Sequence, residues 1–349
     1  MDGHPLSSKL EYIFSLLGSK STSAVKQGKA RLAALIEEEG DILLNRLNPV
    51  NIESRALTKW LSERIQKLFN EDSKFGGLYA VDLLLEVDYC DVTMRTMLFS
   101  RLLCDTAKSS TQPEVVELAT QIWGKLLTNG CALLDDIVNA EIQDALERLD
   151  TVPLSSAKRF VSCLFLLEIA DHAPGALAHR QEEVLALIWA PIKDPSASCR
   201  SAAARVLGKC LPLLTEVTED AAHSTGELCE TVMKNIIKGM QAKQPEAVHG
   251  SLTALVEAVP VMKRMDVKMR QFIAEVDSII VSFLQKFATV PQIVRKALLD
   301  ILPVMAKVDQ DTFLQQVVPV LSANGYAGVP RGIPRRSAII DVHRHWPHR

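Results

Sequence analysis

Apolar residues recur at helical spacing along nearly the whole chain. Trp60, Leu61, Ile65 and Leu68 are one example of the i, i+1, i+5, i+8 pattern that places side chains on one face of a helix. The best candidate for a strand, 83–87, lies inside a longer run with a period of 3.6 residues. The pattern therefore predicts an all-α fold of about fifteen helices joined by short polar turns. Their expected spans are 6–18, 22–39, 52–70, 74–87, 91–108, 112–128, 132–149, 154–171, 176–192, 196–215, 224–241, 244–259, 264–287, 290–307 and 310–322.

A weak internal repeat organises these helices. Its clearest copy runs from Asp194 to Gly208 and contains a turn aspartate, an apolar-Arg pair and three alanines. Partial copies start at 116, 248 and 294, at spacings that are multiples of roughly 40–50 residues, and this resembles the HEAT repeat. Two antiparallel helices cannot bury both apolar faces alone, so such pairs stack and share a core. The prediction is a HEAT/armadillo-type α-solenoid of about seven helix pairs.

Asp194 and Arg200 are the polar residues that stand out in this repeat. Asp194 falls in the predicted turn, and Arg200 falls in the first turn of the helix that follows. We expect the arginine to reach the turn aspartate of its own or an adjacent repeat. The two residues are therefore predicted to form a structural ladder between repeats, with no catalytic role.

Composition and charge exclude several classes of protein. The 349 residues are 48% hydrophobic and 5% aromatic, and Lys+Arg 39 against Asp+Glu 42 gives a net charge of −3. This balance is not that of a basic nucleic-acid binder. No apolar stretch approaches the ~20 residues of a transmembrane helix, and the N-terminus lacks the plan of a signal peptide. The seven cysteines form no C-x-x-C pair, which predicts reduced core thiols in a cytoplasmic protein.

The chain changes character at about residue 324. Residues 1–323 carry −7 and are predicted to be the HEAT-repeat array, whereas 324–349 carry +4 and are rich in Gly, Pro and Arg. We expect 324–349 to be a disordered tail, and the alternative is an artefact of a mispredicted exon. His343, His345 and His348 fit an H-x-H-x-x-H spacing, but a flexible tail offers no preformed metal site. No metal ligand is therefore assigned.

Motifs that would carry enzyme chemistry are missing from the sequence. There is no G-x-x-x-x-G-K-[ST], G-x-G-x-x-G, H-E-x-x-H or G-x-S-x-G, and no kinase catalytic loop. Gly76-Gly77 is the one paired glycine, and close helix packing explains it better than phosphate binding. We expect no catalytic or cofactor-binding residues, no cofactor, and no phosphotransferase activity in this chain.

An ordered series of segments resembles the target of rapamycin (TOR) kinases, of the PI3-kinase-related kinase family. Single segments are short, but their order along roughly 6–323 follows that family. They are Gly76–Val87, Pro113–Val116 with Gly124–Leu126, Ala145–Leu149, Ile188–Pro195, His249–Leu252 and Ala297–Pro303.

The resemblance implies that this chain is similar to the N-terminal HEAT-repeat region of a TOR serine/threonine kinase. In that family the region is a protein-binding scaffold in nutrient and growth signalling, and the kinase domain lies outside the segment that this chain resembles. The implied partners are a raptor-like subunit, other regions of a TOR protomer or dimer, and a Rheb-type GTPase. The implied location is the cytoplasm and the surface of lysosomal or vacuolar membranes. The alternative is a HEAT-repeat adaptor of another class, a nuclear transport receptor or a phosphatase scaffold.

Overall fold

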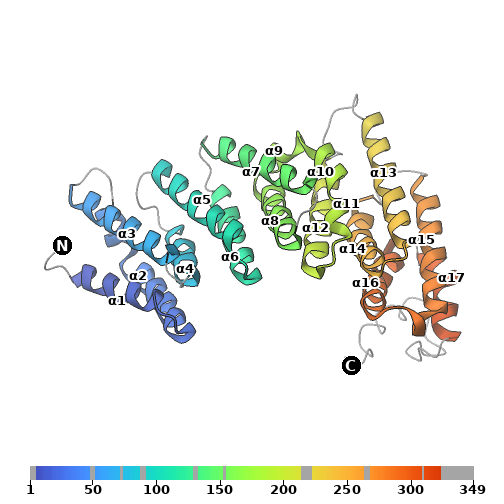
Figure 1. Cartoon of the computed structure of the whole chain (residues 1–349), viewed down its shortest axis with the longest axis horizontal. Helices are drawn as coiled ribbons and strands as arrows, with labels where there is room; N and C mark the ends of the chain where they lie inside the picture. The colour runs from blue at the N-terminus through green and yellow to red at the C-terminus, as the bar shows by residue number, and fades with distance from the viewer. Residues whose placement is uncertain are drawn as a thin grey trace. The chain divides into compact units, whose positions relative to one another are not determined.

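Helices make up the regular structure throughout the part of the chain described by the computed structural model (Figure 1). The model describes residues 5–47, 52–70, 74–86, 92–128, 133–151, 155–213, 222–262, 268–308 and 310–323, and no strand occurs among them. The chain divides into two compact units, residues 1–145 with 164–176 and residues 146–163 with 177–349. The all-α prediction is confirmed.

Unit 1 is built from consecutive helices that pack as antiparallel neighbours. α1 packs on α2, α3 on α4 and α5 on α6, while α2, α4 and α6 follow one another in a row (Figure 1). The helices are α1 Pro5–Leu17, α2 Thr22–Leu47, α3 Ile52–Asn70, α4 Lys74–Leu84, α5 Val92–Ser109 and α6 Pro113–Thr128. Two more helices, α7 Leu133–Asp150 and α8 Ser156–His172, contribute residues to both units.

A fully buried tryptophan, Trp123, packs in the core of unit 1. Trp123 on α6 is 0% exposed, and its ring meets Phe165 edge to face with centroids 5.1 Å apart. Its indole Nε1–H donates to the Ser100 hydroxyl at 3.0 Å, so the polar atom of this large side chain is satisfied. The paired glycines also serve packing, since a Cβ on Gly77 would lie 2.9 Å from the Phe69 ring.

Unit 2 contains two rows of helices. α12, α14 and α16 form one row, and α13, α15 and α17 form the other (Figure 1). The elements are α9 Pro174–Ala178, which spans the division between the units, α10 Gln181–Leu187, α11 Trp189–Ile192, α12 Ala197–Leu213, α13 Ala222–Met240, α14 Pro245–Met262, α15 Lys268–Gln285, the 3₁₀ turn Phe287–Thr289, α16 Gln292–Val308 and α17 Gln310–Ala323. Apolar side chains from both rows fill the space between them.

Most predicted helices match the observed ones to within a few residues at each end, and two predicted spans differ more than that. The span predicted as one helix, 176–192, is three short helices, α9 to α11. The helix predicted to end at 39 continues as α2 to Leu47, with a non-helical backbone at Glu39 (φ −124°, ψ 16°) marking a kink. The first difference concerns breaks inside a span and the second concerns where a helix ends, and the order of the elements is as predicted.

Several sequence predictions fall on particular residues of the fold. Five cysteines lie in the described part of the chain, and all five are buried free thiols: Cys104, Cys163, Cys199, Cys210 and Cys229. The predicted tail 324–349, with its three histidines, lies outside the described residues. In the described part of the chain, no helix combines the length and apolar character needed to cross a membrane.

Candidate functional site

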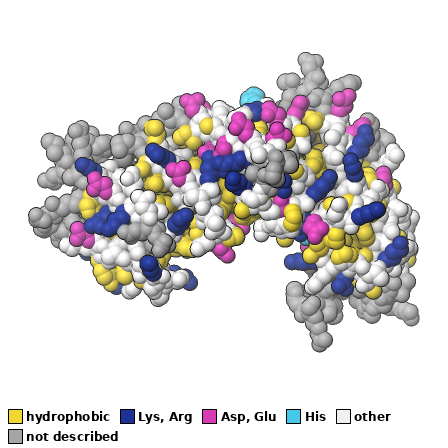
Figure 2. Space-filling model, in the orientation of Figure 1, with side chains coloured by type: hydrophobic (Ala, Val, Ile, Leu, Met, Phe, Trp, Pro, Cys, Tyr) yellow, Lys and Arg dark blue, Asp and Glu magenta, His cyan; other side chains and the backbone are white. Residues whose placement is uncertain are grey.

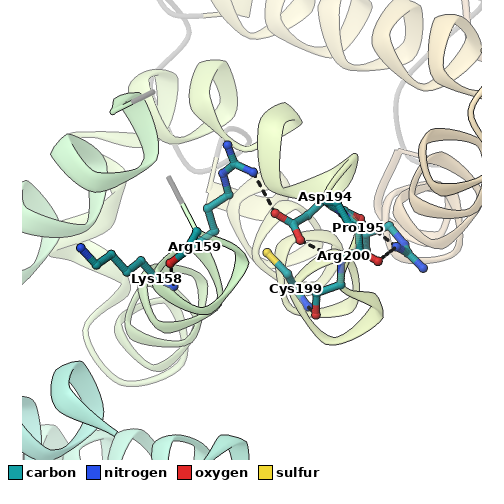
Figure 3. A network of polar contacts seen from close by, with 8 residues as sticks. Lys158, Arg159, Asp194, Pro195, Cys199 and Arg200 are labelled. Atoms are coloured by element: carbon teal, nitrogen blue, oxygen red, sulfur yellow. Dashed lines mark hydrogen bonds and ion pairs between the residues drawn. The ribbon is translucent and has the colours of Figure 1, made fainter. Parts of the chain in front are cut away.

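The predicted ladder residues belong to a polar network at the turn between α11 and α12 of unit 2. Asp194 lies in this turn, and its side chain has no exposed surface. One carboxylate oxygen accepts the Ser196 amide N–H at 2.8 Å, which closes the turn that starts α12. The other accepts Nη1 of Arg159 on α8 at 2.9 Å (Figure 3). The buried charge is thus neutralised by an ion pair and a main-chain hydrogen bond.

Burial alone would raise the pKa of the Asp194 carboxyl, since a charged group is costly away from water. Hydrogen bonds from Ser156, Arg159 and the Ser196 amide, with the Arg159 charge, outweigh burial and lower the pKa below 3.8. A carboxyl with a lowered pKa in the folded state stabilises that state above its ordinary pKa. The stabilisation is lost as the pH falls below 3.8 through the folded value, so the network is intact at neutral pH.

Arg200 is the second predicted residue, and it is 2% exposed in the first turn of α12. Its Nη1 donates to the main-chain oxygens of Asp194 at 2.7 Å and Pro195 at 2.8 Å. Its Nε donates to Nδ1 of His249 at 3.0 Å. The expected contact with Asp194 is therefore made through that residue's carbonyl, while the carboxylate bonds Arg159. The guanidinium joins the α11–α12 turn to α14, and Figure 3 shows Arg200 beside Asp194 and Pro195 of that turn.

The backbone of α14, the helix that carries His249, also lies close to the α11–α12 turn. Gly250 follows His249 on α14, and a Cβ built on it would lie 1.7 Å from the Ile192 carbonyl oxygen and 3.2 Å from Cδ of Arg200. Only a residue without a side chain fits this position. The Arg200–His249 bond and the Gly250 contact together fix α14 against the end of α11.

Sequence reasoning found part of this network and missed part of it. Asp194 and Arg200 lie together, but whether they act as a ladder repeated along the array stays a prediction. The Arg200–His249 bond joins two positions that correspond in the repeat pattern. Arg159 is not among the predicted residues, and its one signal in the sequence is its place directly before the apolar run 160–167.

The Cys163 thiol next to this network and the Cys210 thiol of α12 are poor nucleophiles. Cys163 is 0% exposed, and a hydrogen bond that its thiol donates to Cys199, together with burial, raises the pKa of the Cys163 thiol well above 9.0. Burial likewise raises the pKa of Cys210 to about 12. Thiolates are the reactive form, so these side chains act as core residues. Across the described part of the chain, no group of three His, Cys, Asp or Glu is placed to hold a metal ion.

A second polar cluster lies in unit 1, around Lys108 on α5. Its Nζ lies 2.7 Å from Glu141 and 2.8 Å from Asp144, both on α7, and 5.6 Å from the centroid of the Phe165 ring. Burial alone would lower the pKa of Lys108, but the hydrogen bonds to Asp144 and Glu141 raise it. The ammonium therefore stays charged and joins α5 to α7.

A double-mutant cycle on Arg159→Ala and Asp194→Asn tests the ion pair of the network. We expect a coupling energy of about 1–3 kcal/mol, because either change leaves a largely buried partner without its counter-charge. Urea unfolding followed by circular dichroism measures it. The matched cycle of Arg200→Ala with Asp194→Asn should give a smaller coupling energy. Arg200 bonds the main-chain carbonyl oxygen of residue 194, which the change to asparagine leaves in place. Additive effects at Arg159 and Asp194 would contradict the assigned pair.

Comparison with known sequences gives several TOR kinases among the relatives of this chain. The chain is 25% identical over 323 residues to the serine/threonine-protein kinase TOR of Oryza sativa, and 25% identical over 329 residues to TOR2 of Saccharomyces cerevisiae. Each match covers 88% of this chain and 13% of the relative. TOR of Arabidopsis thaliana is 23% identical over 266 residues, which are 74% of the chain and 10% of that protein. No model of a known protein family matches the chain.

Comparison with solved structures identifies the fold. The chain superposes on Kap95p from a complex with RanGDP with a TM-score of 0.59, at 12% identity, over 91% of this chain and 40% of that one. Kap121p bound to RanGTP gives a TM-score of 0.53 at 11% identity, over 96% of this chain and 37% of that one. Likeness at this identity shows the fold alone, and the predicted HEAT/armadillo-type α-solenoid is confirmed.

The relationship to TOR rests on sequence, and the helical-repeat fold is consistent with it. The TOR matches span about an eighth of the relatives' length, and this chain folds as helical repeats over the part it shares with them. The chain is similar, over nearly its whole length, to a HEAT-repeat region of the TOR serine/threonine-protein kinases.

Proposed function

We propose that this chain is a protein-binding scaffold of TOR-type signalling in response to nutrients and growth. The observation that carries the proposal is the match to TOR kinases over 88% of the chain, at about twice the identity shared with the solved karyopherins. Fold alone is common to many helical-repeat proteins, whereas the TOR matches rest on sequence similarity over nearly the same length. In this proposal the scaffold contributes binding, and the serine/threonine kinase activity belongs to the whole TOR-like protein.

The surface of the repeats supports recognition of proteins. Figure 2 shows hydrophobic, basic and acidic side chains interspersed over the visible face. Large apolar side chains open to solvent include Met97 on α5, 58% exposed, and Tyr12 on α1, 48% exposed and stacked under the Arg31 guanidinium. Exposed aromatic, methionine and arginine side chains are enriched in protein interfaces.

The partner we propose is a raptor-like subunit, with further contacts to other regions of a TOR protomer or dimer and to a Rheb-type GTPase. We place the assembly in the cytoplasm and at the surface of lysosomal or vacuolar membranes. Helical repeats offer long shallow surfaces, so a partner's binding energy is spread over several repeats. Binding by one stretch of repeats is weaker than binding by the whole assembly.

A region exchange in yeast TOR2 tests the proposal. The part of TOR2 that matches this chain is replaced by residues 1–323, and co-purification of the raptor-like subunit is measured at low and moderate salt. The matched control carries a Kap121p segment of equal length, which has the fold without the TOR sequence. We expect the exchange with this chain to retain the subunit and the Kap121p exchange to lose it.

The alternative adaptor function has its own outcome. Kap95p and Kap121p were solved with Ran, so the full chain is also mixed with Ran loaded with GTP and with a phosphatase catalytic subunit. Co-elution with either of these, combined with loss of the raptor-like subunit in the exchange, would overturn the TOR proposal. Loss of the subunit from both exchanged proteins would overturn it as well.

A further inference from the structure

We propose that His249 makes the contact between α12 and α14 sensitive to pH, because only its neutral ring can accept the Arg200 hydrogen bond. Protonation turns this acceptor into a second cation beside the guanidinium and releases the contact. The proposal concerns the fold of unit 2 itself and does not depend on which partner the chain binds.

The hydrogen-bond roles at this contact allow one protonation state. An arginine carries donors only, so Nδ1 of His249, 3.0 Å from Arg200 Nε, must be an unprotonated acceptor. The imidazole proton therefore sits on Nε2. A protonated imidazole carries N–H groups on both nitrogens and offers Arg200 no acceptor. The Arg200–His249 bond and an imidazolium exclude each other.

Arg200 cannot turn away from a protonated His249 ring without losing other hydrogen bonds. Its Nη1 is held by the carbonyls of Asp194 and Pro195, at 2.7 and 2.8 Å, so turning away would break both bonds. The guanidinium stays ionised at any physiological pH. Protonation of His249 thus places two positive charges about 3 Å apart in a largely buried site.

The charged groups around the ring favour its neutral form. Arg200 faces it from α12 and Lys296 from α16, and burial together with these two charges lowers the pKa of His249 below 6.5. The nearby acidic residues interact with other groups than the His249 ring. Glu246 of α14 interacts with Arg200, and the Asp194 carboxylate bonds Arg159 and Ser196. From α14 itself, Thr253 lies with its hydroxyl 3.5 Å from Nδ1 and donates to the His249 carbonyl.

The contact lies where α14 approaches its neighbours closely. Gly250, next to His249, leaves no room for a side chain against the Ile192 carbonyl, and a Cβ on Gly239 of α13 would lie 1.9 Å from the Ser251 hydroxyl oxygen. A lost bond at His249 therefore acts on the segment through which α14 meets both α11–α12 and α13. The result is local opening of α14 and of the first turn of α12.

The direction of the pH effect follows from linkage. With a folded pKa below 6.5, the opened state binds more protons than the closed state once the pH falls toward 6.5. Closure is therefore at full strength only above pH 6.5 and weakens as the pH falls from 6.5 toward the folded pKa. At about pH 5.5 the opening equilibrium rises at most about tenfold, the limit for a group with an ordinary histidine pKa.

Hydrogen exchange of the full chain tests this proposal. Protection factors, corrected for intrinsic exchange, are compared at about pH 7.5 and about pH 5.5 for α14 and the first turn of α12. We expect a several-fold loss of protection there at the lower pH. In His249→Asn, whose amide oxygen takes the place of Nδ1 and does not titrate, that loss should disappear. The matched control is His179→Asn, an exposed histidine of unit 2, which should keep the loss.

Two results would overturn the proposal. One is an equal loss of protection in the wild-type chain and in folded His249→Asn. The other uses the wild-type chain alone, so it stands even if the variant does not fold. It is an NMR titration that gives the His249 imidazole a pKa at or above the ordinary value.

Discussion

Gly250→Ala is expected to destabilise unit 2 by about 3 kcal/mol or more. The new Cβ would lie 1.7 Å from the main-chain oxygen of Ile192, and a backbone atom cannot move aside as a flexible side chain can. α14 would have to shift away from the α11–α12 turn, which would also stretch the Arg200–His249 bond of 3.0 Å. Urea unfolding followed by helical circular dichroism gives the free energy of unfolding.

Gly226→Ala is the matched control for this prediction. Gly226 also lies inside a helix of unit 2, α13, but nothing lies within 4 Å of a Cβ built on it. Alanine there removes backbone freedom from the unfolded chain and should stabilise by about 0.5–1 kcal/mol. Equal unfolding midpoints for the two variants would show that α14 does not approach the turn as described.

Arg200→Ala should cost about 2–3 kcal/mol of folding stability. The guanidinium supplies hydrogen bonds to three acceptors: the carbonyls of Asp194 and Pro195 and the ring of His249. Alanine leaves these largely buried acceptors without their donor, and the cost of unpaired buried groups exceeds the value of the bonds themselves. The same urea measurement reports this change.

Two variants distinguish the geometry of Arg200 from its charge. Arg200→Lys keeps the charge but not the planar arrangement of donors, so it should retain most of the loss. Arg205→Ala removes an exposed arginine from the same helix and should change stability by less than about 0.5 kcal/mol. If Arg200→Lys were as stable as the wild type, a single charge would suffice and the three assigned bonds would be wrong.

The helices could be predicted from the sequence because burial follows the helical period. A helix that packs on one side repeats its apolar positions every 3.6 residues, and a single chain displays that repeat directly. The breaks within 176–192 do not show in this way, because Leu177, Val184 and Ile188 stay buried at nearly helical spacing across them. Pro191 marks the break at Ile188, because a proline cannot donate the helical hydrogen bond to the Leu187 carbonyl, and no proline marks the break at 179–180.

The polar network could be predicted only where its partners are close in sequence. Asp194 and Arg200 are six residues apart, so a turn followed by a helix brings them together whatever the rest of the chain does. Arg159 lies 35 residues from Asp194, and His249 lies 49 residues from Arg200. Those pairings depend on which helices stack and in what register, and periodicity does not specify register.

The sequence separation between Arg200 and its three acceptors sets the order in which these hydrogen bonds can form during synthesis on a ribosome. The two carbonyl acceptors of Arg200 lie five and six residues upstream and are already made when the arginine emerges. Its third acceptor follows 49 residues later, which takes about 2–10 s at ordinary rates of translation. During that interval Nη1 of Arg200 can bond the two turn carbonyls, while its Nε donates to water. The Nε donor of the nascent chain therefore stays hydrated until α14 of the next repeat supplies His249.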